Sequence, residues 1–140
     1  MELYAHLTFN GNCRQAMTFY QDCLGGRLHF QTVGDFPAAT KLIKRVKRCI
    51  VLAALSKNGM VLLGSDLTAD SWLIRGNAIT LTLRCKSKQE MKAICDKLAD
   101  GGSIHDSLKL NYWGIWSVNL KDKFGHHWLL TTTNRGRKVK

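Results

Sequence analysis

The chain has 140 residues, a formal net charge of +11 and 45% hydrophobic residues. This length favours one domain with a sizeable core, and no apolar run reaches the roughly 20 residues that a membrane-spanning helix needs. The sequence opens with neither the basic nor the apolar region of a signal peptide, and its five cysteines lack Cys-x-x-Cys spacing, which argues against a disulfide framework. We therefore expect a protein of the reducing cytoplasm, without a membrane partner.

The first part of the chain predicts a strand followed by a helix. Residues 3–9 alternate between apolar and polar side chains, as in a strand with one buried face. Asn12 is well suited to cap the following helix, whose apolar stripe is centred on Met17. Gly25 and Gly26 are suited to end that helix.

Further strands are predicted downstream, separated by a basic run. Residues 27–33 predict one strand, and residues 49–55 and 60–63 predict a hairpin around an Asn58-Gly59 turn. Five of the eight residues in 41–48 are basic, and we expect this run to be an edge strand or hairpin arm protected by its charge. It lacks the interleaved aromatic side chains of a single-strand-binding surface, so a solvated role is favoured over nucleic-acid binding.

The second half of the chain repeats this pattern. Residues 79–84 predict a strand, and Ser87 and Glu90 form a capping box at the start of a second helix. Three short strands should follow that helix, at about 103–106, 115–120 and 126–132.

The two halves read as the same βαβββ unit, written twice. Phe9 at the end of the first strand precedes Met17 on the first helix, and Leu83 precedes Met91 at the same spacing. Neither unit can cover its own apolar faces, so we predict an α+β fold in which two modules pack as a single domain, a curved mixed sheet around a cavity. The expected boundaries are about 1–75 and 76–134 for the modules and 135–140 for a solvated basic tail.

Six short motifs stand in the order of one known family. They are Phe9-Asn10-Gly11-Asn12-Cys13, Phe19-Tyr20, Leu24-Gly25-Gly26, Leu63-Gly64-Ser65-Asp66, Tyr112-Trp113-Gly114 and Asp122-Lys123-Phe124-Gly125-His126-His127-Trp128. From about residue 3 to 133 the chain resembles the glyoxalase/bleomycin-resistance group, the vicinal oxygen chelate (VOC) superfamily, in its PhnB-like branch. The resemblance implies paired βαβββ modules, a cavity and a homodimer. It also implies either chemistry on a substrate chelated to a divalent metal, or metal-free binding of small molecules such as antibiotics.

The resemblance places the metal ligands of the family's enzymes on the cavity face of four strands. His6 on the first strand is a good ligand. On the strand predicted for residues 49–55, Ala53 and Leu55 are expected to face the cavity, and neither can coordinate a metal. Asn77 offers only a weak oxygen donor, and Leu129 stands where the carboxylate is usual. One good ligand is too few for a metal site, so we predict no metal and no other cofactor.

The site expected instead is an aromatic and apolar cavity with a few polar contacts. His127 shares its strand face with Leu129, and Trp113 lies on a loop where its ring can stack on a planar ligand. The positive charge favours an anionic or aromatic small molecule as the partner. The ligand-binding residues that we predict are His6, Thr8, Leu55, Tyr112, Trp113 and His127.

Two alternative functions rank behind that of a metal-free binding protein. The first is a metal-dependent lyase, isomerase or dioxygenase with substituted ligands. The second is a basic adaptor that binds nucleic acid or an acidic partner through residues 41–48 and the tail. For Asp66 and Asp70 we expect turn or capping roles, and for Cys49 and Cys85 structural roles.

Overall fold

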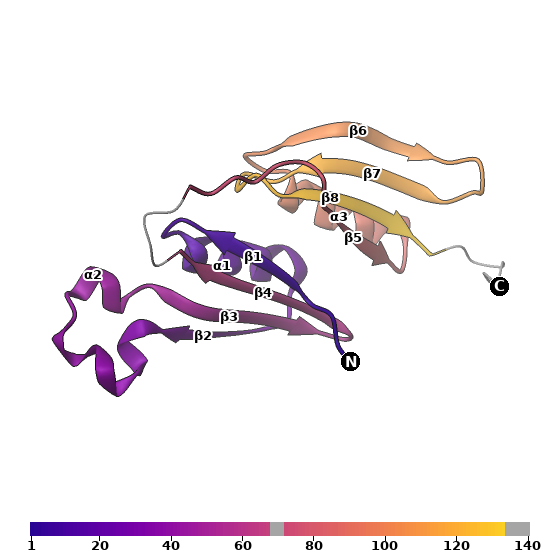
Figure 1. Cartoon of the computed structure of the whole chain (residues 1–140). Helices are drawn as coiled ribbons and strands as arrows, with labels where there is room; N and C mark the ends of the chain where they lie inside the picture. Colours follow the sequence, from indigo (N-terminus) through magenta and orange to yellow (C-terminus); the bar gives the residue numbers. More distant parts are fainter. Residues whose placement is uncertain (68–71, 134–140) are drawn as a thin grey trace. The chain divides into compact units, whose positions relative to one another are not determined.

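The computed structural model describes residues 1–67 and 72–133, so Asp70 and the basic tail expected at 135–140 lie outside the described residues. The chain divides into two compact units, Met1–Ile74 and Arg75–Lys140. Each unit has the order βαβββ, with a four-stranded mixed sheet and a helix on one face of it (Figure 1). The two-module α+β architecture is therefore confirmed, while the packing of the modules into one domain stays a prediction.

The first unit carries its apolar core between one helix and one sheet. Its strand order is β1-β4-β3-β2, with β1 and β4 parallel and the other pairs antiparallel. At the β3–β4 turn, Asn58 and Gly59 have φ of 40° and 87°, the left-handed pair expected of a two-residue hairpin. The elements are β1 (Ala5–Phe9), α1 (Cys13–Leu24), β2 (Arg27–Thr32), β3 (Ile50–Lys57) and β4 (Met60–Asp66). The residues that α1 buries are Cys13, Ala16, Met17, Tyr20, Cys23 and Leu24.

The connection from β2 to β3 is helical. It contains the short 3₁₀ helices η1 (Val33–Asp35) and η2 (Pro37–Lys41), followed by α2 (Lys44–Lys47). The edge strand or hairpin arm expected for 41–48 was wrong. Pro37 has no N–H to donate to a neighbouring strand, and the lysines and arginines that follow are good helix formers.

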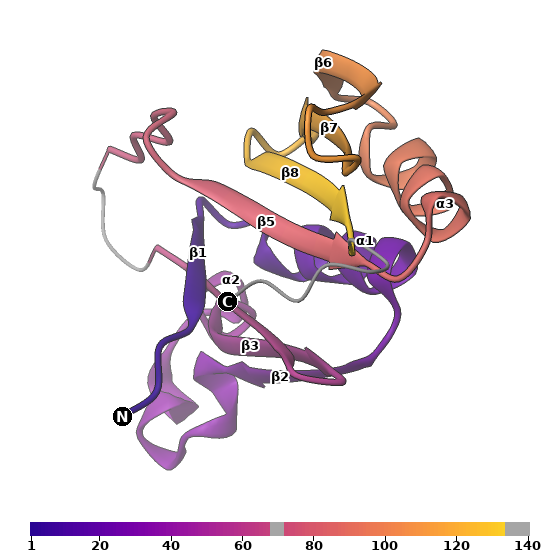
Figure 2. The ribbon, with the colours of Figure 1, turned by 90° about the vertical axis from the view of Figure 1, so that its right-hand side faces the viewer.

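The second unit repeats the topology, with strand order β5-β8-β7-β6 and β5 parallel to β8. Its helix α3 lies on one side of β5, β7 and β8 (Figure 2) and buries Met91, Cys95 and Leu98. No helix in the described part of the chain combines the length and the apolar character needed to span a membrane. The elements are β5 (Thr80–Cys85), α3 (Lys88–Leu98), β6 (Ser103–Leu110), β7 (Trp116–Lys121) and β8 (His127–Thr132).

The second helix begins with a local cap. Ser87 Oγ accepts the N–H of Glu90 at 3.1 Å, which confirms the first half of the predicted capping box. The Glu90 carboxylate accepts the N–H of Lys86 rather than that of Ser87, so the second half is shifted by one residue.

The first helix begins with a cap from a distant strand. The Asn12 side chain makes no capping bond, contrary to the prediction, and its Oδ1 has no hydrogen-bond partner in the described part of the chain. Asp66, at the end of β4, takes that role: its Oδ1 accepts the N–H of Cys13 at 2.9 Å, and its Oδ2 accepts the N–H of Ile50 at 3.0 Å. The capping role expected of Asp66 is confirmed.

Candidate functional site

We call the face of each sheet that lies opposite its helix the open face. In the first unit, a Cβ built on Gly64 would lie 3.0 Å from the Met17 sulfur, so Gly64 faces α1. Ala53 is the register partner of Gly64, and Leu55 shares its side of β3. Both side chains are 0% exposed. The expectation that Ala53 and Leu55 line a cavity was wrong, because β3 is apolar on both faces and its sequence does not distinguish them.

The open face of the first unit carries small polar side chains from β1 and β4. His6 Nε2 lies 2.8 Å from Ser65 Oγ, and Thr8 is the register partner of Ser65. His6 is exposed and Thr8 is half-buried. On β3 the residues of this face are Leu52 and Ala54, so the corrected assignment still places no coordinating side chain on that strand.

In the second unit, buried and half-buried side chains alternate along β8, as expected from the sequence. Trp128 and Leu130 are 3% and 0% exposed, and Val118, the register partner of Leu130, lines a groove against α3. Trp128 and Leu130 therefore face the helix. His127 and Leu129 alternate with them and lie on the open face.

A cavity of about 320 Å³ lies at the start of β8 in this unit. The rings of His105 and His127 stack there, with centroids 5.8 Å apart and planes at 29°. The Asn119 amide donates to the Asp106 carboxylate at 3.1 Å. The cavity thus offers imidazole, amide and carboxylate groups to a polar ligand. Its lining residues are Asn77, Thr80, His105, Asp106, Asn119, Leu120, His127 and Trp128.

His105 is not among the site residues that the sequence predicts. The register of β6 against β7 shifts between Ile104 and Asp106, so simple alternation does not reveal the face of the residue between them. The sequence signals for a functional role of His105 are its imidazole side chain and its position next to a charged residue in a predicted strand.

Tyr112 and Trp113 lie at the tip of the β6–β7 hairpin. Both are exposed (95% and 65%), and their rings meet edge to face with centroids 5.9 Å apart. His127 pairs with Lys121 at the other end of β7, about 16 Å away at about 3.3 Å per strand residue. Within the second unit, the structure therefore does not bring Trp113 and His127 into one site.

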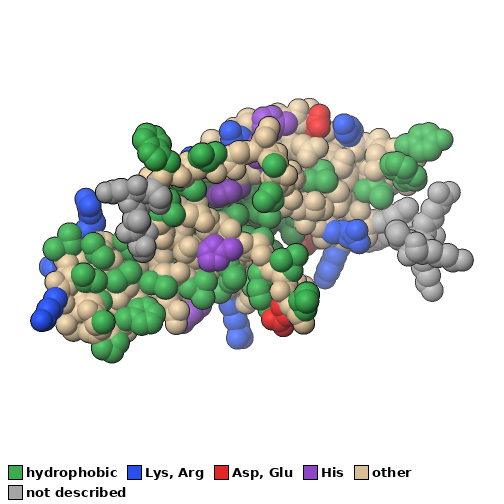
Figure 3. All heavy atoms as spheres, viewed as in Figure 1, with side chains coloured by type: hydrophobic (Ala, Val, Ile, Leu, Met, Phe, Trp, Pro, Cys, Tyr) green, Lys and Arg blue, Asp and Glu red, His purple; other side chains and the backbone are tan. Residues whose placement is uncertain are grey.

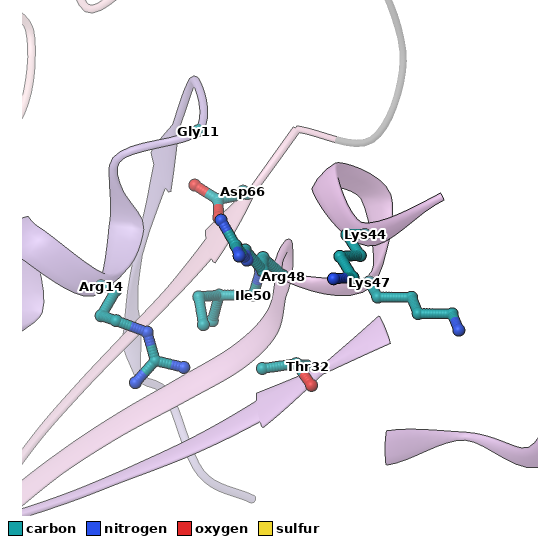
Figure 4. A pocket seen from close by; sticks show the side chains of 8 residues that line it. All are labelled: Gly11, Arg14, Thr32, Lys44, Lys47, Arg48, Ile50 and Asp66. Carbon is teal, nitrogen blue, oxygen red and sulfur yellow. The ribbon is translucent and has the colours of Figure 1, made fainter. Parts of the chain in front are cut away.

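A second cavity, of about 430 Å³, lies in the first unit beside α2 (Figure 4). We call it the basic pocket. This pocket does not follow from the sequence, where residues 41–48 predict a solvated edge strand. In the structure, α2 gathers the cations of this run beside Arg14 of α1. The lining residues are Gly11, Arg14, Thr32, Lys44, Lys47, Arg48, Ile50 and Asp66.

The connection that carries the basic pocket also exposes apolar side chains. Phe36, Leu42 and Ile43 are 45%, 42% and 65% exposed. Figure 3 shows Lys and Arg side chains beside apolar ones at this end of the first unit, with acidic side chains at few places on the visible face. The connection is therefore a surface of mixed apolar and cationic character.

Each unit contains a buried cysteine whose thiol pKa is raised well above its usual value. Burial, together with the nearby Asp66 carboxylate, raises the pKa of Cys13 to about 12. Burial and the Glu90 carboxylate raise the pKa of Cys85 to about 11, which fits its expected structural role. In neither unit do the described residues bring together three His, Cys, Asp or Glu side chains that could hold a metal ion.

The paired βαβββ units define a glyoxalase/bleomycin-resistance fold. Solved structures described as glyoxalase-related or glyoxalase/bleomycin resistance/dioxygenase proteins share it, at 13–17% identity and TM-scores of 0.58–0.63. At such low identity the likeness shows the fold alone.

Residues 1–131 match the family described as 3-demethylubiquinone-9 3-methyltransferase. The chain belongs to this family, and its fold is the one that the resemblance to the PhnB-like VOC proteins predicts.

Three relatives are similar over nearly the whole chain. Protein PA1353 from Pseudomonas aeruginosa is 28% identical with a TM-score of 0.82, covering 94% of this chain and 97% of its own. A putative 3-demethylubiquinone-9 3-methyltransferase, PhnB protein, from Bacillus cereus is 22% identical with a TM-score of 0.74, covering 95% and 100%. Protein YjdN of Escherichia coli (strain K12) is 26% identical over 145 residues, covering 96% and 97%.

Proposed function

We propose that this chain is a small-molecule-binding protein that works without a metal. The observation that carries the proposal is Leu129, which lies on the open face of β8 where the resemblance places a carboxylate ligand. Its hydrocarbon side chain cannot coordinate an ion. Leu52 and Ala54 on the open face of β3 support the same conclusion.

The proposed ligand contacts are polar groups of the two open faces. His6 and Thr8 are the contacts in the first unit, and His127 is the contact in the second, beside Asn119 in the 320 Å³ cavity. Within each unit, these groups form directional hydrogen bonds and suit the polar edge of a flat molecule. The family's description names a demethylated quinone, whose ring has that character.

Two exposed aromatic side chains are proposed as a separate contact surface. Tyr112 and Trp113 lie at the opposite end of the second sheet, where a planar ligand can stack on either ring. Leu55 is no longer part of the proposed site, because it is buried under α1. Following the resemblance, we also propose a homodimer in the cytoplasm, with an anionic or aromatic small molecule as ligand.

A chelator experiment on a matched pair of variants tests the proposal. Purified protein is dialysed against EDTA and screened by ligand-observed NMR against small aromatic acids and quinols. We expect binding to be unchanged by EDTA and to weaken about tenfold in His127→Ala, because the variant loses a hydrogen bond in a cavity. Thr131→Ala, on the same face of the same strand, is the control and should bind as the wild type.

Two results would contradict the proposal. One is binding that disappears with EDTA and returns with a divalent ion, which would support the metal-dependent enzyme. The other is equal affinity of the His127→Ala and Thr131→Ala variants, which would remove the cavity from the site.

A further inference from the structure

The basic pocket presents four cations that form no ion pair with a carboxylate among the described residues. Arg14 comes from α1, and Lys44, Lys47 and Arg48 come from α2 and the residue after it. Asp66 is the acidic residue among those that line the pocket. In the described part of the chain, no ion pair joins any of these five side chains.

Asp66 is already engaged by the backbone. Its two oxygens accept the N–H groups of Cys13 and Ile50, and it is 8% exposed. If its carboxylate turned to a lysine or arginine, the two N–H groups would be left without an acceptor. Asp66 therefore keeps its place at the starts of α1 and β3, and its single charge offsets only part of the positive charge of the four cations that line the pocket.

The four cations are not equally available. Lys47 Nζ donates to the Thr40 carbonyl at 3.2 Å, and in Figure 4 its side chain points away from the other lining residues. Lys44 and Arg48 are four residues apart and lie on one side of the helical turn. Lys47 therefore holds the connection together, while Lys44 and Arg48 are directed toward the pocket.

Arg14 completes the set from the other side. Its guanidinium lies 4.5 Å from the centroid of the Phe30 ring, a cation–π contact that positions the group without using its N–H donors. Ile50, 1% exposed, gives the pocket an apolar floor. An anion bound here would relieve the repulsion among the cations and receive forked donors from Arg14 and Arg48.

We propose that the basic pocket binds the phosphate group of a small phosphorylated molecule. The three charges of Arg14, Lys44 and Arg48 suit a phosphate better than a single carboxylate, because the phosphate carries up to two negative charges and offers a third oxygen to a further donor. A concave site of about 430 Å³ fits a metabolite-sized ligand. No lining residue is aromatic, so nucleic-acid bases would find no stacking surface. Lys41 and Arg45 of the same basic run lie outside the lining.

The test uses inorganic phosphate and pyrophosphate, titrated calorimetrically into the full chain at low salt. We expect saturable binding that is tighter for pyrophosphate. The double variant Lys44→Gln with Arg48→Gln should raise the Kd about tenfold or more, because two charge-assisted contacts are lost. Arg14→Gln should raise it by several-fold.

The matched control is Lys41→Gln with Arg45→Gln, which removes the same charge from the same run. All four of these lysines and arginines are exposed, so both double variants should melt as the wild type does. The control should keep its Kd within about twofold of the wild type, because a diffuse charge effect of two exposed residues is small. Absence of saturable binding, or equal weakening in both double variants, would overturn the proposal.

A third arm separates a small phosphorylated ligand from a nucleic acid. In this arm, a short single-stranded oligonucleotide competes with pyrophosphate for the protein. If it displaces pyrophosphate and its affinity falls equally in the two double variants, the basic run is a surface for polyanions, and the proposed phosphate site is refuted. The site uses no residue of the open faces. Its failure would therefore leave the His127 experiment, and with it the proposed function, unaffected.

Discussion

The two units of this chain share a sheet and a helix but differ in the connection that follows the second strand of each. In the first unit that connection spans residues 33–49, forms three short helices and builds the basic pocket. In the second unit the connection is a tight turn at 111–115, which carries two exposed aromatic side chains. The repeated βαβββ frame buries the core in both. The chemistry that each unit offers to a ligand is set by this variable connection and by the open face of its sheet.

The units also differ in which face of an inner strand a similar leucine occupies. Leu55 of β3 and Leu129 of β8 read alike in the sequence, yet Leu55 is buried beneath α1 and Leu129 lies half-buried on an open face. Four predictions follow from such contrasts, and each compares one unit with the other or isolates one residue of a unit.

The largest expected effect is that of Leu55→Ala. Removing a fully buried side chain leaves a cavity under α1, so we expect the free energy of unfolding to fall by about 2–5 kcal/mol. Leu129→Ala, on the open face of the second sheet, should cost about 1 kcal/mol. Urea unfolding of both variants measures the difference. Equal costs would mean that the two leucines share one environment, which would contradict the burial of Leu55 under α1 and the position of Leu129 on the open face.

Asp66→Ala should destabilise the first unit by about 2–4 kcal/mol. The substitution removes the acceptor of two buried N–H groups, at the start of α1 and at the start of β3. Asp66→Asn keeps one acceptor oxygen and should lose less. Amide hydrogen exchange at Cys13 and Ile50 locates the effect, and unchanged protection at both amides would contradict the long-range cap.

Ser87→Ala should cost less, about 1 kcal/mol, because the variant loses one local capping bond at the start of α3. The expected loss of protection is confined to the first turn of that helix. Thermal melting followed by circular dichroism gives the size of the effect. A cost as large as that of Asp66→Ala would show that both helices depend on their caps to the same extent.

How far the sequence predicts this fold depends on the range over which each signal acts. On β1, polar and apolar residues alternate, so the face of His6 follows from local pattern. On β8, three apolar residues follow His127, so the sequence relates His127 to Leu129 only through strand geometry. On β3 the run from Val51 to Leu55 is apolar throughout, and the choice of face is made by α1, which the local pattern does not contain. The Asp66 cap joins residues 53 positions apart in the chain.

The candidate sites illustrate the same limit. A dense run of lysines and arginines at 41–48 has no clear strand or helix periodicity, and its function as a pocket wall depends on Arg14 of a separate helix. His105 sits where the strand register shifts, and its contact with His127 arises only from the pairing of β6, β7 and β8. Sequence patterns predicted the frame and its motifs, while the contacts that build the pockets depend on tertiary structure.

The smallest expected effect is a change in how stability depends on pH, caused by His126. Burial lowers the pKa of His126 below its usual value near 6.5; the Asp122 carboxylate opposes this shift, and the charges of Arg75 and His127 add to it. As the pH falls below about 6.5, the unfolded chain therefore takes up the proton before the folded protein does, and the free energy of unfolding decreases. His126→Gln removes this contribution, so urea unfolding measured from about pH 7.5 to about pH 5 should show a shallower loss of stability than in the wild type. A loss as steep as in the wild type would mean that His126 is equally easy to protonate in both states, against the burial seen beside Asp122.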